Sequence, residues 1–199
     1  ALVTRLAAGG RGTAFEDLSM GLALHRGAQR PSSPFESPLQ QIELARPALE
    51  RLFAHGTLGS PDLFTRGLWD GLAEVLRAQR EVAWTYEFIE PLAEIWAPWR
   101  VGALALAWAD GEELDHEGAV ARLAPLVAAD PTDRELVLGY AAALDGVGLF
   151  AEAATALGRL LETNPGDRAL RKSLARARAR AGDAGWRELA LELLREDPE

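Results

Sequence analysis

The stretch RVGALALAWADGEELDHEGAVARLAPLVAADPTD at residues 100–133 is followed directly by RELVLGYAAALDGVGLFAEAATALGRLLETNPGD at residues 134–167. Aligned without a gap, these two 34-residue stretches share nine identical positions. The pairs are Arg100/Arg134, Leu104/Leu138, Ala107/Ala141, Ala109/Ala143, Ala119/Ala153, Leu123/Leu157, Leu126/Leu160, Pro131/Pro165 and Asp133/Asp167. A fixed period of about 34 residues is typical of arrays of helix pairs, which stack into solenoids that bind other chains. The sequence therefore predicts a protein that holds a partner.

Residues 134–167 carry apolar, small and turn-forming side chains at regular intervals. They are Val137, Tyr140, Ala141, Leu144, Gly148, Phe150, Ala153, Leu157, Leu160 and Pro165. In this pattern the segment resembles a tetratricopeptide repeat. Tyr140 and Leu160 depart from the usual residues of that family, but both are apolar enough to pack. Ala141 and Ala153 would let two antiparallel helices approach closely, and Pro165 would end the second helix.

The resemblance extends to both neighbouring stretches with more departures. Residues 100–133 match at several positions, although Asp110 stands where a bulky residue is expected. Residues 168–199 resemble a degenerate closing unit, because terminal repeats meet water on one face. The expected fold is all-α, with antiparallel helix pairs stacked as a right-handed solenoid. Repeats are predicted at 100–133, 134–167 and 168–199, after a helical region at 1–98 that consists of diverged repeats or a separate cap.

Helix-forming residues dominate the whole chain, and apolar positions recur every three or four residues. Pro91 is expected to kink or split one helix. Thr132–Glu135 reads as a capping box, and Asp167 as a helix N-cap. The predicted helices span about 13–27, 37–56, 60–79, 84–97, 99–110, 116–129, 132–145, 150–163, 167–181 and 184–196.

Composition excludes several classes of function. The 199 residues include no cysteine, which excludes disulfides and thiolate metal sites. The net charge of −9 argues against general nucleic-acid binding, and no apolar run has the roughly 20 residues needed to cross a bilayer. We expect a cytoplasmic protein, with a mature exported chain as the alternative. Because the chain begins at Ala1, a fragment of a larger protein is also expected.

Signals for catalysis are weak, and the sequence predicts no enzyme, cofactor or metal. His25, His55 and His116 are far apart and lack the spacing of metal ligands. The glycine-rich stretch at 9–12 has no Gly-Lys-Ser/Thr. Asp115-His116-Glu117 falls in the turn between two repeat helices, where His116 is expected to pack.

The resemblance implies that the first helix of each unit lines a concave groove that binds a peptide. Leu104, Trp108 and Leu138 would give apolar contacts. Lys172, Arg176 and Arg180 would meet acidic groups of the partner. The full set of groove positions is Val101, Leu104, Trp108, Glu112, Glu135, Leu138, Ala142, Lys172, Arg176 and Arg180. Lys172 and Arg176 match positions that hold a terminal carboxylate in some family members, but the asparagines of that clamp are absent from the earlier units.

Several alternatives stay open at this point. The basic residues of 168–180 would also suit a solvated helix face. Trp96, Trp99 and Trp108 would form either core packing or a sticky surface, and the loop Pro31–Pro38 either a linker or a docking segment. The chain as a whole would instead be a regulatory repeat domain of a bacterial transcription regulator or signalling ATPase, or a small helical enzyme or ligand-binding domain on a repeat scaffold. A homodimer is a further alternative.

Overall fold

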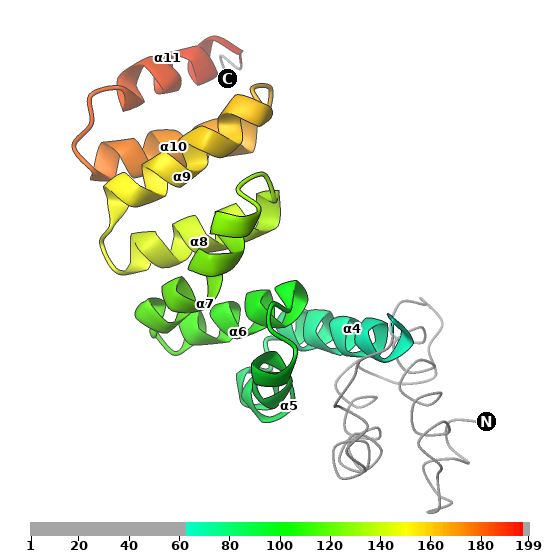
Figure 1. The fold of residues 1–199 in the computed structure, drawn as a ribbon. Coiled ribbons are helices and arrows are strands. Elements are labelled where there is room, and N and C mark those ends of the chain that lie inside the picture. The colour runs from blue at the N-terminus through cyan, green and yellow to red at the C-terminus, as the bar shows by residue number, and fades with distance from the viewer. Residues whose placement is uncertain (1–62, 197–199) are drawn as a thin grey trace, which may run out of the picture. The chain divides into compact units, whose positions relative to one another are not determined.

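The computed structural model describes residues 63–196, and within that range every regular element is an α-helix (Figure 1). The helices are α4 (Leu63–Gln79), α5 (Val82–Ile95), α6 (Arg100–Glu112), α7 (His116–Ala129), α8 (Arg134–Gly146), α9 (Phe150–Thr163), α10 (Arg168–Arg180) and α11 (Trp186–Glu196). The all-α prediction is confirmed for this range. The helices predicted at 13–27 and 37–56, the glycine-rich stretch 9–12 and the loop 31–38 lie outside the described residues.

The chain forms two compact units, which meet inside α6 between Ala105 and Leu106. In the first unit, α4 and α5 pack together, and the core includes Trp69, Phe88 and Leu92. α5 continues through Pro91, so this proline does not split the helix. The predicted domain boundary near residue 98 stays a prediction.

Two tryptophans predicted as either core or sticky surface belong to the core of the first unit. Trp96 and Trp99 are only 5% and 3% exposed, and their rings meet edge to face at 5.2 Å. The Trp99 indole donates a hydrogen bond to Asp70 Oδ1 at 2.6 Å. A Cβ on Gly102 would overlap the Trp99 ring, so a residue without a side chain is needed there.

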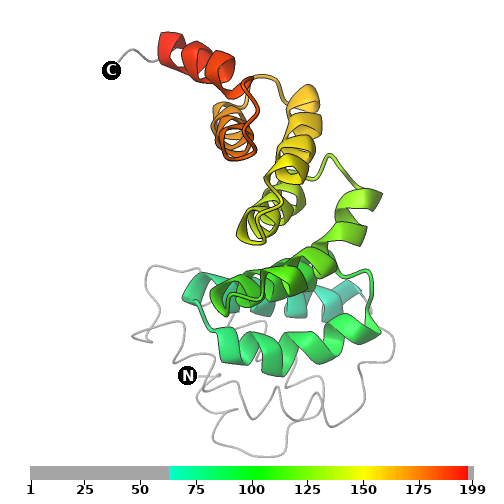
Figure 2. The ribbon, with the colours of Figure 1, turned by 90° about the vertical axis from the view of Figure 1, so that its left-hand side faces the viewer.

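In the second unit each helix packs on the next, from α7 to α11. Figures 1 and 2 show these helices following one another along the unit. Ala141 and Ala153 are buried, as the close approach of two helices requires. The core of this unit is a cluster of side chains from α8, α9 and α10: Val137, Ala141, Leu144, Ala153, Leu157, Leu160, Leu170, Leu174 and Ala177.

Aspartates begin three of the helices in this unit. Asp115 accepts from the Gly118 N–H at 2.9 Å, and Asp167 accepts from Leu170 N–H at 3.0 Å, which confirms the predicted cap at Asp167. The capping box at Thr132 is wrong. Asp133 caps α8 instead, because the Thr132 hydroxyl donates to Asp130 Oδ1 at 2.7 Å.

The first helix of each 34-residue repeat (α6, α8 and α10) ends in the same turn. Residues 114, 148 and 182 are one period apart and have φ angles of 65°, 82° and 75°. After α8, the Leu149 N–H donates to the Leu144 carbonyl at 2.9 Å, the bond typical of a helix ended by a left-handed residue. Gly148 and Gly182 adopt this conformation without steric cost, whereas Leu114 does not.

Leu114→Gly is therefore expected to raise the free energy of unfolding by about 1 kcal/mol, because glycine relieves the left-handed strain. Leu114 is 78% exposed, so its side chain gives up little packing. Urea denaturation followed by circular dichroism measures the effect, with Gly148→Ala as the converse variant that should lose stability. A loss of stability in Leu114→Gly would mean that the leucine makes contacts that offset its strain.

Asp110 occupies the position where the repeat pattern expects a bulky apolar residue, and it is only 2% exposed. Its carboxylate accepts a hydrogen bond from Arg122 Nε at 2.8 Å. In the repeat at 100–133, an ion pair between α6 and α7 thus takes the place of the apolar contact that the repeat pattern predicts.

Candidate partner-binding surfaces

The first helices of two consecutive repeats, α8 and α10, are joined by ion pairs at both ends. Arg134, the first residue of α8, donates to Asp167, the N-cap of α10, at 2.9 Å. Near the other ends, Arg180 of α10 contacts Asp145 of α8. Because one pair links the two starts and the other links the two ends, α8 and α10 run in the same direction and in register.

The pair between Arg134 and Asp167 also affects titration. The hydrogen bond from the Arg134 side chain, followed by that from the Leu170 backbone N–H, holds the pKa of the Asp167 carboxyl below its ordinary value. A carboxyl with a lower pKa in the folded state stabilises the fold above its unfolded pKa, and this contribution is lost as the pH falls through the folded pKa.

Asp167→Asn is accordingly expected to cost stability near pH 7 and to cost progressively less below about pH 4, the ordinary pKa of an aspartate. Asparagine still caps a helix, so the charge is the main change. Urea denaturation of both proteins at a series of pH values gives the difference. A difference that does not change with pH would show that the charge at this position does not matter.

The residues predicted for the groove differ in exposure. Leu104 is buried in the first unit, and Trp108 is half-buried. Leu138 on α8 is half-buried, while Lys172 and Arg176 on α10 are exposed. Leu138 and Lys172 occupy equivalent positions of α8 and α10, one 34-residue period apart.

Arg180 is held by groups of its own unit. In addition to Asp145, its guanidinium lies over the Phe150 ring, 4.2 Å from the centroid. Arg180 thus connects α10 with both helices of the preceding repeat. Its side chain is still 47% exposed, so its predicted contact with a partner stays a prediction.

The turn Asp115–Glu117 gives no sign of a reactive site. A Cβ on Gly146 would overlap the His116 ring, so the imidazole packs against the end of α8. Within residues 63–196 there is no cluster of side chains that could hold a metal ion. Among the helices in that range, none is long and apolar enough to span a bilayer.

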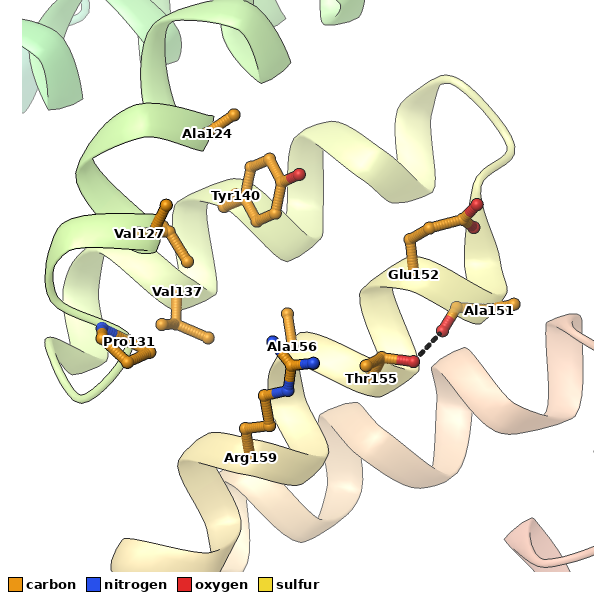
Figure 3. Close-up of a pocket in the computed structure, with 11 residues that line it drawn as sticks. Ala124, Val127, Pro131, Val137, Tyr140, Ala151, Glu152, Thr155, Ala156 and Arg159 are labelled. Atoms are coloured by element: carbon orange, nitrogen blue, oxygen red, sulfur yellow. Dashed lines mark hydrogen bonds between the residues drawn. The ribbon is translucent and has the colours of Figure 1, made fainter.

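One hollow in the second unit was not predicted from the sequence. It is a trough of about 560 Å³ between α7 and α9, with α8 as its floor (Figure 3). Its lining is Ala124, Val127, Ala128, Pro131, Val137, Tyr140, Ala151, Glu152, Thr155, Ala156 and Arg159. Four alanines on the facing helices leave this space open. The small residues on α7 and α9 can be seen in the sequence. The hollow itself also depends on the distance between these two helices, which the sequence does not give.

The tetratricopeptide repeat family model matches residues 108–184, which begin in α6 and end after α10. These residues are therefore similar to tetratricopeptide repeats. In the repeat notation, α8 and α10 are first helices, and α7 and α9 are second helices. Searches of curated proteins and of solved structures found no match. Tetratricopeptide repeats are in general protein-interaction modules and are typically non-catalytic scaffolds.

Proposed function

We propose that the tetratricopeptide repeats bind a peptide segment of a partner protein along the face formed by α8 and α10. Two ion pairs support this proposal most. Arg134–Asp167 and Asp145–Arg180 hold α8 and α10 in register. A surface ordered before binding loses little conformational entropy when the ligand arrives. The repeats would act as a scaffold and would not catalyse a reaction.

The charge of this face favours a partner with acidic groups. Lys172 and Arg176 are four residues apart, so they project from neighbouring turns of one side of α10. Both are exposed, and among the described residues neither forms an ion pair. Because the chain as a whole carries a charge of −9, this local excess of positive charge would direct an acidic segment to this face.

Apolar contacts would supply the larger part of the affinity. Exposed ion pairs contribute only about 0.2–1 kcal/mol each. Leu138 on the same face is half-buried, and Trp108 offers a further half-buried aromatic side chain on α6. In this proposal the acidic groups of the partner determine the specificity of binding. Its apolar side chains, which pack on Leu138, supply most of the affinity.

The proposal is tested by selecting binders from a displayed library of random peptides with the full chain. We expect enrichment of peptides that combine apolar and acidic residues, and their loss when the chain carries Lys172→Glu and Arg176→Glu. Arg187→Glu with Arg195→Glu on α11 makes the same charge change elsewhere and should keep binding. Equal binding by both double variants would contradict a site on α10, and selection of basic peptides would contradict the charge argument.

A further inference from the structure

We infer that the trough between α7 and α9 is a second docking site, for an amphipathic helix of a partner protein that carries both an acidic and a basic group. This site is independent of the face proposed above. Successive residues in a helix are turned by about 100°, so Val137 and Tyr140, which line the trough, lie on a different side of α8 from Leu138 and Ala142. The repeats would then engage partners on two sides.

The walls of the trough fit an apolar helix face. Val127, Val137 and Tyr140 point toward the hollow in Figure 3. Alanines of α7 and α9 also line it, and their small side chains leave room for a ligand. The one hydroxyl, that of Thr155, donates to the Ala151 carbonyl at 2.9 Å and needs no partner from a ligand. An apolar hollow between two helices can take a third helix through residues spaced three, four and seven apart.

Two opposite charges stand along the α9 wall. Glu152 lies in the first turn of α9, and Arg159 lies seven residues later. This spacing is two helical turns, or about 10.5 Å, too far for the two groups to pair with each other. Both are exposed, and neither forms an ion pair with any residue that the structure describes.

These charges define the chemistry of the occupant. A docked helix that runs along α9 has the same rise per residue, so its own side chains seven apart span the same distance. An acidic residue would meet Arg159, a basic residue would meet Glu152, and apolar residues between them would enter the trough. A purely acidic or purely basic helix would leave one like-charge contact, which disfavours it.

The test is a selection of helical peptides about 15 residues long, roughly four turns, with the full chain as bait. We expect the enriched peptides to carry an acidic and a basic residue about seven positions apart, with apolar residues between them. Ala128→Phe, which fills the trough from α7, should weaken their binding by about tenfold or more. Ala129→Phe changes the neighbouring exposed alanine outside the trough and should leave binding unchanged. Circular dichroism confirms that both variants keep their helices.

Charge reversal identifies the contacts. A selected peptide should lose affinity for Arg159→Glu and regain it when its own acidic residue is replaced by lysine. Binding that withstands Ala128→Phe, or a peptide without opposite charges, would overturn the proposal.

Two other occupants have distinct signatures that would also overturn it. Self-association that Ala128→Phe abolishes in sedimentation velocity would assign the trough to a second copy of the chain. Enrichment of no peptide, with binding of the dye 1-anilinonaphthalene-8-sulfonate to the native chain and not to Ala128→Phe, would assign it to small apolar molecules. Because the Lys172 and Arg176 variants do not alter the trough, failure here leaves the α8 and α10 face to be judged by its own experiment.

Discussion

Leu160→Ala is expected to lower the free energy of unfolding of the repeats by about 2–5 kcal/mol, the usual cost of truncating a fully buried leucine. Leu160 on α9 has no exposed surface, and it belongs to the cluster that also contains Leu157, Leu170 and Leu174. The substitution removes packing from both faces of α9, because this cluster joins α8, α9 and α10. A small domain has a total stability of about 5–15 kcal/mol, so the loss is a large fraction.

Urea denaturation followed by circular dichroism measures this loss, with Leu191→Ala as the matched control. Leu191 is 54% exposed on α11, and its truncation should change stability by less than about 0.5 kcal/mol. Similar losses in the two variants would show that the helices of the second unit do not share the core described here.

Asp110→Ala is expected to cost about 1.5–3 kcal/mol, the usual contribution of a hydrogen bond to a charged group. The carboxylate is buried and accepts from Arg122 Nε, whereas the Arg122 side chain is 30% exposed. Water can therefore reach part of the guanidinium left behind, which keeps the cost below that of isolating a fully buried charge. The loss would loosen the packing of α6 on α7.

A double-mutant cycle with Arg122→Ala separates the pair from its surroundings. If Asp110 acts through Arg122, the cost of Asp110→Ala should shrink when Arg122 is already absent. Strictly additive losses would mean that the two side chains stabilise the protein independently. Asp110→Leu in the same background tests whether the apolar residue expected by the repeat pattern is tolerated, since buried ion pairs are often replaceable by apolar residues.

The sequence predicted the helices of the repeats well because apolar residues recur at helical spacing and the 34-residue period relates one helix pair to the next. The predicted bounds 116–129 and 150–163 coincide with α7 and α9. The start of α8 was less well placed, since aspartates at 130 and 133 compete with Thr132 for the capping role. Local patterns alone do not decide between such neighbours.

The candidate sites were harder to predict because they depend on distances between helices. The 34-residue period indicated that α8 and α10 are equivalent, but the ion pairs that hold them in register come from side chains 33 and 35 residues apart. Arg180 matched a ligand position by its place in the repeat, yet it contacts Asp145 and Phe150. The trough between α7 and α9 results from small side chains on helices that are not adjacent in sequence.

The central claim is that the face of α8 and α10 binds a peptide, and nuclear magnetic resonance mapping tests it most directly. A peptide selected on the full chain for combining apolar and acidic residues is titrated into isotopically labelled protein, and the backbone amide shifts are followed. The largest changes are expected around Leu138 and Ala142 on α8 and around Lys172 and Arg176 on α10, with little change in α4 and α5. Changes confined to α4 and α5, or none along α8 and α10, would contradict the account.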